Sequence, residues 1–172
     1  FTIKKNIDHL FTVYPHESKI FKKAKVPVTF VGHPLANKIP INPNIKNTRK
    51  KLNLAANKII TLLPGSRISE IKNNLGLMFN SVNLINKEFL WNKLKKPQFI
   101  IPVNSKNNYN FIVRSLDSSN NNLNNIKLIF GHSHDAICAS DFVISVSGTA
   151  TLEAALFKKP MVIVYKTSLI SW

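Results

Sequence analysis

The residues best suited to chemistry stand at positions 147–153 and read Ser-Gly-Thr-Ala-Thr-Leu-Glu. Apolar runs on both sides predict a buried strand that turns sharply into a helix across Gly148. Such a turn aims backbone N–H groups and the positive end of a helix dipole at one place, which suits an anion. The hydroxyls of Thr149 and Thr151 can add to these amides, and Glu153 can accept hydrogen bonds from a sugar. The segment is therefore a candidate cradle for a nucleotide diphosphate, and a merely capped helix is the alternative.

A second segment, at positions 64–67, offers a complementary group. It follows an apolar run and reads Pro-Gly-Ser-Arg. Gly65 lets the backbone approach a ligand closely, Ser66 can cap the following helix, and Arg67 presents a planar charged fork. Arginine is rare in this lysine-rich chain, so its use in this turn indicates that the fork geometry matters. The alternative is an ordinary surface arginine after a strand.

A third group of polar residues, from His132 to Asp135 with Cys138 one turn later, contains metal-competent side chains. No distant ligands complete a set, so we expect a polar loop beside a buried thiol and no metal. The alternative is that the same loop, at the carboxyl edge of the predicted sheet, borders a nucleobase. His33 stands alone beside a proline, which favours a structural role unless a cleft brings it to the ligand.

The elements that position these residues alternate between strands and helices. The clearest helix carries an apolar stripe at 3.6-residue spacing, made of Ile71, Leu75, Met78, Phe79, Val82, Ile85 and Phe89. Strands are expected within residues 7–14 and 26–31, and at 58–63, 98–102, 126–130, 141–145 and 160–165. Further helices are expected at 15–21, 48–54, 109–116 and 133–139 and after Gly148, with a polar surface loop at 118–125.

Continuously apolar strands separated by helices predict a parallel sheet covered on both faces, and hence an α/β, doubly wound, Rossmann-like fold. Ligands of such sheets lie at the carboxyl ends of the strands, where both glycine turns fall. Residues 36–47 contain Pro40 and Pro43 among small and polar residues, so no regular structure is expected there. We therefore predict a hinge at 37–47, between the end of one domain (1–36) and a second domain (48–172).

Composition narrows the class of partner. The 172 residues are 44% hydrophobic, enough for one core, and the single cysteine excludes a disulfide framework. The formal net charge of +16 would suit nucleic acid, anionic lipid or a phosphorylated substrate. However, the lysines are scattered, the arginines are few, and the aromatic residues stand mainly in apolar runs. These features disfavour a nucleic-acid-binding module, which stays open as an alternative. No apolar run reaches the roughly 18 residues that span a bilayer.

Taken in chain order, three segments resemble lipid-A-disaccharide synthase. They are Gly-His-Pro-Leu at 32–35, Leu-Leu-Pro-Gly-Ser-Arg at 62–67 with Glu70, and residues 147–153 followed by Pro-Met-Val at 160–162. The likeness runs from about Asp8 to the C-terminus. It implies a B-type glycosyltransferase, in which two Rossmann-like domains face each other across a cleft. It also implies inverting transfer of a diacylated glucosamine unit from UDP-2,3-diacylglucosamine to 2,3-diacylglucosamine 1-phosphate, with release of UDP.

The resemblance assigns roles to the candidate residues. It implies contacts with the diphosphate from Gly148, Thr149 and Thr151, with the ribose from Glu153, and with the phosphate region from Gly65, Ser66 and Arg67. Gly131 and His132 would lie near the uracil, and His33 would lie at the cleft. No metal or other cofactor is implied, because helix dipoles and Arg67 can stabilise the departing diphosphate.

The resemblance also implies parts beyond this chain. Family members carry an acceptor-binding half before the position of Phe1 and a segment after that of Trp172. The eight acidic residues here offer no evident acid and base pair, so we expect the general base in the first half and an inactive chain by itself. The implied partners are an acylated glucosamine phosphate acceptor, the anionic inner face of the cytoplasmic membrane, and a second copy in a full-length homodimer, without nucleic acid. Another UDP-sugar enzyme of this architecture, such as an epimerase, is the alternative.

Overall fold

The chain divides into two compact units, Phe1–Pro40 and Ile41–Trp172. This computed structural model describes residues 2–55, 57–118 and 123–166. The division falls inside residues 37–47, the segment that the sequence suggests is a hinge. The assignment of the two parts to an acceptor-side domain and a nucleotide-binding domain stays a prediction.

The expectation that residues 36–47 lack regular structure is wrong at both ends of the segment. Helix α3 (Leu35–Lys38) lies at one end, and helix α4 (Ile45–Lys51) begins at the other, earlier than the predicted residues 48–54. Pro34 precedes α3, Pro40 follows it and Pro43 precedes α4. No proline lies inside either helix, so no intrahelical hydrogen bond is lost. Pro34 is the N-cap of α3, and the side chain of Asn44 caps α4 by accepting the amide of Asn47 at 3.0 Å.

The first unit also contains helix α1 (Thr2–Asn6), strand β1 (Leu10–Thr12), helix α2 (Pro15–Lys23) and strand β2 (Val28–Phe30). β1 and β2 pair in parallel, with Leu10 opposite Val28, and α2 connects them. A parallel pair needs such a crossover connection. The unit therefore contains a β-α-β motif, as the sequence predicted for residues 7–31.

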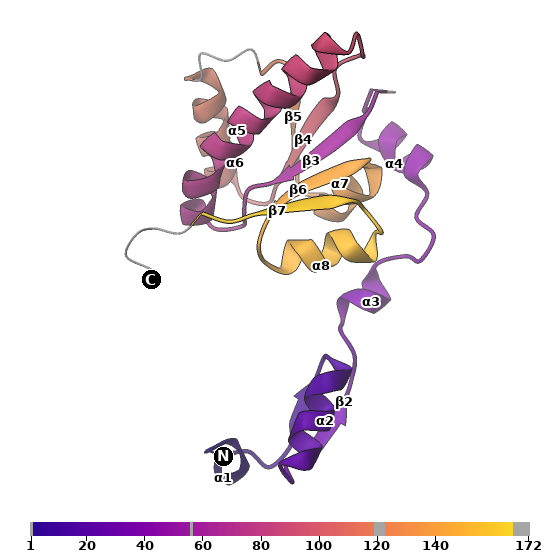
Figure 1. The fold of residues 1–172 in the computed structure, drawn as a ribbon, viewed down its shortest axis with the longest axis vertical. Coiled ribbons are helices and arrows are strands. Elements are labelled where there is room, and N and C mark those ends of the chain that lie inside the picture. Colours follow the sequence, from indigo (N-terminus) through magenta and orange to yellow (C-terminus); the bar gives the residue numbers. More distant parts are fainter. Residues whose placement is uncertain (1, 56, 119–122, 167–172) are drawn as a thin grey trace. The chain divides into compact units, whose positions relative to one another are not determined.

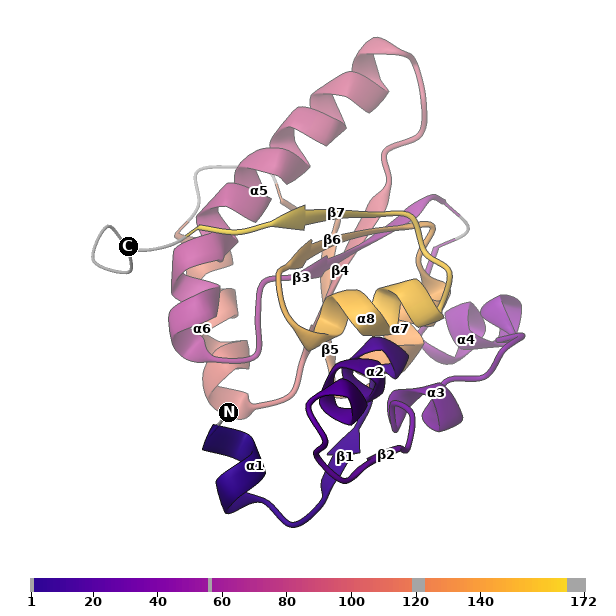
Figure 2. The same ribbon diagram turned by 60° about the horizontal axis from the view of Figure 1, so that its bottom comes forward.

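The second unit is built on a parallel sheet of five strands, β3 (Ile59–Leu63), β4 (Gln98–Val103), β5 (Ile126–Phe130), β6 (Phe142–Val146) and β7 (Met161–Val164). Their order in the sheet is β5-β4-β3-β6-β7, and every pairing is parallel. Helices α5 (Ile68–Trp91) and α6 (Lys106–Asp117) cover one face, and α4, α7 (Ser133–Ala139) and α8 (Thr149–Leu156) cover the other (Figures 1 and 2). The predicted doubly wound, Rossmann-like fold is confirmed.

The burial of both faces explains why the strands are continuously apolar. Along β3, Ile60 and Leu62 pack into the core beneath α5 and α6, whereas Ile59 packs with Leu52, the C-cap of α4, and with residues of α7. Thr61 also faces α7 and donates its hydroxyl hydrogen to the carbonyl of Ala136 at 3.1 Å. A strand that alternated apolar and polar residues would leave the helices on one face of the sheet without an apolar surface to pack against.

The apolar stripe of α5 is buried from Ile71 to Val82, as its spacing predicted. The same helix also buries Asn86, which exchanges two side-chain hydrogen bonds with Asn125 at 3.2 and 2.8 Å. Residues 119–122 of the predicted surface loop lie outside the described residues. The prediction of a polar surface loop is wrong at Leu123, which is buried in the core beside α5 and α6.

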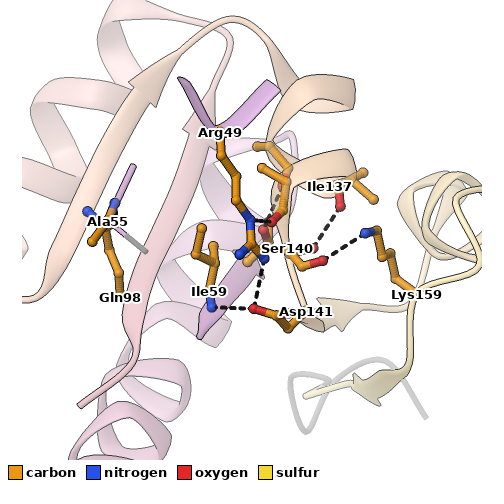
Figure 3. Close-up of polar contacts among 11 residues, drawn as sticks. Arg49, Ala55, Ile59, Gln98, Ile137, Ser140, Asp141 and Lys159 are labelled. Atoms are coloured by element: carbon orange, nitrogen blue, oxygen red, sulfur yellow. Dashed lines mark hydrogen bonds and ion pairs between the residues drawn. The ribbon is translucent and has the colours of Figure 1, made fainter. Parts of the chain in front are cut away.

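A cluster of polar contacts lies at the amino ends of β3 and β6 (Figure 3). Oδ2 of Asp141 accepts hydrogen bonds from Nη2 of Arg49 at 2.9 Å and from the amide of Ile59 at 2.8 Å. Nε of Arg49 donates to the carbonyl of Ala139 at 2.8 Å. Lys159 donates to the carbonyl of Ser140 at 2.8 Å, and burial lowers the pKa of this lysine. The cluster ties α4 to two strands that are far apart in the sequence.

Replacing Asp141 with alanine is expected to lower the free energy of unfolding by about 2 kcal/mol, because a half-buried guanidinium and a strand amide would lose their acceptor. Urea denaturation measures this loss. Asp117→Ala, at the exposed end of α6, is the matched control and should change stability by less than about 0.5 kcal/mol. Equal urea midpoints for the two variants would contradict the structural role of Asp141.

Candidate functional site

A cavity of about 580 Å³ lies at the carboxyl ends of β3, β4 and β6. After β3 the chain adds β4 and β5 on one side and then returns to add β6 on the other, so the cavity lies where the strand order reverses. Doubly wound sheets bind ligands at this point, because the loops from neighbouring strands diverge there. The turns after β3, β4 and β6 and the first turns of α7 and α8 form its walls.

The turn between β6 and α8 contributes free hydrogen-bond donors to this cavity. Gly148, Thr149, Ala150 and Glu153 line it. Among the described residues, the amides of Gly148, Thr149 and Ala150 have no acceptor. Thr151 does not line the cavity, because its amide and its hydroxyl both bond back to the carbonyl of Gly148, at 3.2 and 2.7 Å. The α8 N-terminus thus presents three adjacent unpaired N–H groups to an anion.

The turn between β3 and α5 contributes Gly65, Ser66 and Arg67 to the cavity wall. The expectation that Ser66 caps the helix is wrong, because Arg67 occupies the N-cap position. Glu70 accepts the amide hydrogens instead, from Ser66 at 2.9 Å and from Arg67 at 3.2 Å. The carbonyl of Ser66 accepts a hydrogen bond from the side chain of Asn108 at 2.9 Å. The backbone of this turn is therefore held from two sides.

The guanidinium of Arg67 is exposed, and no hydrogen bond or ion pair joins it to any described residue. Arg67 and Thr149 line the same cavity, although most of the second unit separates them in the sequence. The two glycine turns thus place an unpaired cation and unpaired amides around one space. This combination of donors suits a multiply charged anion such as a diphosphate, because helix N-termini and arginine forks both bind phosphate oxygens.

Several residues that line the cavity were not predicted from the sequence, and one group of them follows β4. Asn104, Ser105 and Asn108 line the cavity, and Ser105 is the N-cap of α6, accepting the amide of Asn108 at 3.2 Å. The available signal was the polar run Asn-Ser-Lys directly after an apolar strand. Glycine was the signal for the other two turns of the cavity, and this turn contains no glycine.

His134 is a further cavity residue that was assigned no separate role. Its Nε2 lies 3.6 Å from Oε2 of Glu153, and its ring packs edge-on against Phe157 with centroids 5.9 Å apart. His134 on α7 therefore lies beside the carboxylate of Glu153, within ion-pair distance but beyond that of a hydrogen bond.

The other predicted site residues lie elsewhere. Gly131 and His132 are not part of the cavity wall. Nδ1 of His132 lies 3.1 Å from Oδ2 of Asp135, which also accepts a hydrogen bond from Lys51 at 2.7 Å. Burial acts to raise the pKa of Asp135, but the hydrogen bonds and charges of Lys51 and His132 outweigh it and hold that pKa below its usual value. His132 is thus engaged with a carboxylate on α7.

His33 belongs to the first unit, where its Nδ1 accepts the amide hydrogen of Leu35 at 3.2 Å. Its ring lies 6.2 Å from that of Tyr14, measured between centroids. Within the described part of the chain, no group of three or more His, Cys, Asp and Glu side chains is placed to hold a metal ion. In the same residues, no helix has the length and apolar character needed to cross a membrane.

Comparisons with known proteins agree on one family. The family model described as lipid-A-disaccharide synthetase matches residues 1–172. A lipid-A-disaccharide synthase of Methylobacillus flagellatus is 34% identical over 171 residues, which are 99% of this chain and 44% of the relative. One of Cupriavidus pinatubonensis is 39% identical over 168 residues, which are 96% of this chain and 40% of the relative. The chain thus spans less than half the length of these relatives.

Among solved structures, the crystal structure of Anabaena Alr3699/HepE in complex with UDP-glucose is similar in fold, with a TM-score of 0.57. The two sequences are 16% identical, and the similarity covers 94% of this chain and 46% of that one. At this identity the likeness concerns the fold, and function has to be argued from the site.

Proposed function

Because this chain belongs to the lipid-A-disaccharide synthetase family, we propose that it contains the UDP-sugar site of a B-type glycosyltransferase. In the complete protein, the reaction is the transfer of a diacylated glucosamine unit from UDP-2,3-diacylglucosamine to 2,3-diacylglucosamine 1-phosphate. The products are UDP and a disaccharide with a β-1,6 linkage. The names of the relatives support this reaction, and the UDP-glucose bound to the structural neighbour supports the donor class.

The observation that carries the proposal is the pairing of unpaired amides with an unpaired guanidinium around one cavity. The amides of Gly148, Thr149 and Ala150 lie on the wall that α8 forms, and Arg67 lies on the wall that precedes α5. A diphosphate between them would receive backbone hydrogen bonds on one side and the charged fork on the other. Glu153 lies one helical turn into α8, where it can accept hydrogen bonds from the ribose hydroxyls.

These donors also suit the chemical step. In an inverting transfer, the acceptor hydroxyl oxygen forms a bond to the anomeric carbon while the bond from that carbon to the UDP oxygen breaks. The electron pair of the broken bond remains on the diphosphate, whose charge therefore grows in the transition state. Amides and a guanidinium that are already oriented toward this group stabilise the growing charge without reorganising.

The proton released by the acceptor hydroxyl requires a general base. In the cavity, the carboxylate of Glu70 is engaged with two amides and that of Glu153 lies beside His134. We therefore propose that the base comes from outside residues 1–172. The same proposal includes an acceptor site in the complete protein, a hinge at residues 37–47 and a place for His33 at the interdomain cleft. It also includes a homodimer of the full-length protein.

We propose that the complete protein binds peripherally to the inner face of the cytoplasmic membrane. The formal net charge of +16 supports attraction to anionic headgroups. On charge alone, the same value supports the binding of nucleic acid equally well. That alternative needs a direct test.

Calorimetric titration of the intact protein with UDP and with a random oligonucleotide separates the two partners. UDP is expected to bind saturably at one site, and the oligonucleotide is expected to bind weakly and to lose its signal as salt is added. Tight oligonucleotide binding without any UDP signal would overturn the proposed function. Isolation of the disaccharide from the two lipid substrates would then test the reaction itself.

A further inference from the structure

The turn between β3 and α5 already contains an anion of its own. Oε2 of Glu70 accepts the amide hydrogens of Ser66 and Arg67, at 2.9 and 3.2 Å. Consecutive amides that converge on one oxygen are the arrangement by which turns bind phosphate oxygens. These two amides are consequently not free to bind a ligand. The turn before α8 differs, because the amides of three of its cavity residues have no acceptor among the described residues.

The turn is built tightly around the Glu70 side chain. A Cβ atom added to Gly65 would lie 2.5 Å from Cβ of Glu70 and 2.6 Å from its Oε2. Gly65 also has a φ of +123°, a conformation that residues with a Cβ rarely adopt. The glycine therefore permits the close approach of Glu70, whereas the sequence suggested that it permits the approach of a ligand.

Glu70 also constrains where a diphosphate can bind. Its carboxylate lies in the cavity wall, so a phosphate on the amides of Ser66 and Arg67 would have to displace it or approach a like charge. The Asn108 side chain holds the carbonyl of Ser66 at the same time, at 2.9 Å, which fixes the backbone that carries Arg67. The donors that remain for the diphosphate include the free amides of α8 and the Arg67 guanidinium.

We infer that Glu70 is a positioning residue for donor binding. Its carboxylate accepts the amide hydrogens of the β3–α5 turn, so that a phosphate cannot bind there, and it holds Arg67 at the cavity. The UDP diphosphate is thereby directed to the N-terminus of α8. This inference rests on the proposed function, since it names UDP as the ligand. The rival role is that of a placeholder, which the diphosphate displaces from the amides on binding.

UDP titrations of three variants of the intact protein distinguish the two roles. Glu70→Ala removes the acceptor, so the turn loosens, and UDP affinity should fall about 10-fold, the effect of losing a charge-assisted hydrogen bond. Glu70→Gln keeps an oxygen acceptor at the same reach and should bind UDP within about 3-fold of the unchanged protein. Glu88→Ala is the matched control on the exposed side of α5 and should have no effect on UDP binding.

Hydrogen exchange of the Ser66 and Arg67 amides, measured without ligand, provides an independent readout. Exchange should be slow in the unchanged protein, and fast in Glu70→Ala. Tighter UDP binding by either Glu70 variant, or Glu70→Ala affinity equal to that of the unchanged protein, would overturn the positioning role while leaving the proposed function intact. A lack of UDP binding by the unchanged protein would overturn the proposed function and the role of Glu70 together.

Discussion

Replacing Arg67 with alanine is expected to weaken UDP binding by roughly 30-fold, because in the proposed site its guanidinium pairs with the diphosphate from the turn before α5. The side chain has no hydrogen-bond or ion-pair partner among the described residues, so its removal breaks no polar contact and should leave folding unchanged. Calorimetric titration with UDP measures the loss. The thermal unfolding midpoint of the free protein should move by less than about 2 °C.

Two further variants show whether UDP affinity depends on the planar guanidinium of Arg67 or only on its positive charge. Arg67→Lys keeps the charge but cannot form two parallel hydrogen bonds, so we expect a loss of roughly 5-fold in UDP affinity. Arg114→Ala removes one positive charge from the exposed surface of α6, outside the cavity wall. It should leave UDP affinity within about 2-fold at physiological salt, where distant charges are screened. Equal losses in Arg67→Ala and Arg114→Ala would mean that UDP responds only to overall charge.

Replacing Gly65 with alanine is expected to lower the free energy of unfolding by about 2 kcal/mol and to weaken UDP binding by at least about 10-fold. The new Cβ would lie 2.5 Å from Cβ of Glu70 at a φ of +123°, so the turn has to move. Movement of the turn displaces Arg67 from the cavity wall. Urea denaturation and UDP titration measure the two effects on the same protein samples.

Gly76 supplies the matched control for this substitution. It lies within α5, and a Cβ at this position would meet no atom within 4 Å. Gly76→Ala should therefore stabilise the protein by about 0.5–1 kcal/mol, because alanine favours the helix. The double variant Gly65→Ala with Glu70→Ala should be less destabilised than the sum of the single variants, since removal of Glu70 side-chain atoms relieves the clash. Strict additivity would show that Gly65 and Glu70 do not interact.

The sequence predicted the fold of the second unit well because its signals are local. Residues 59–63 form a continuous apolar run of strand length, and the α5 stripe repeats at helical spacing, so each element could be recognised without its neighbours. Helix α3 and the first turn of α4 were missed because prolines were interpreted as breaks. A proline ahead of the first turn is compatible with a helix, and the side chain of Asn44 completes the cap.

The cavity was predicted only in part. Glycine turns pointed to Gly65, Arg67, Gly148 and Thr149, and all of these line it. The capping role of Glu70 is also local, since an acidic residue three positions after an N-cap is a known helix signal. It was missed because the N-cap is an arginine, which is not a usual capping residue. Thr151 was included for its residue type, but its hydroxyl bonds to the backbone of its own turn.

By itself, the sequence determined which stretches become strands and helices and which turns contain glycine, because these depend on spacing and backbone conformation within a few residues. Only the tertiary structure decided which turns meet. Asn108 reaches Ser66 across 42 positions of the chain, and Asp141 pairs with Arg49 across 92. The first contact follows from the pairing of β4 with β3, and the second follows from the pairing of β6 with β3. Strand order depends on the packing of the whole sheet, which no local pattern contains.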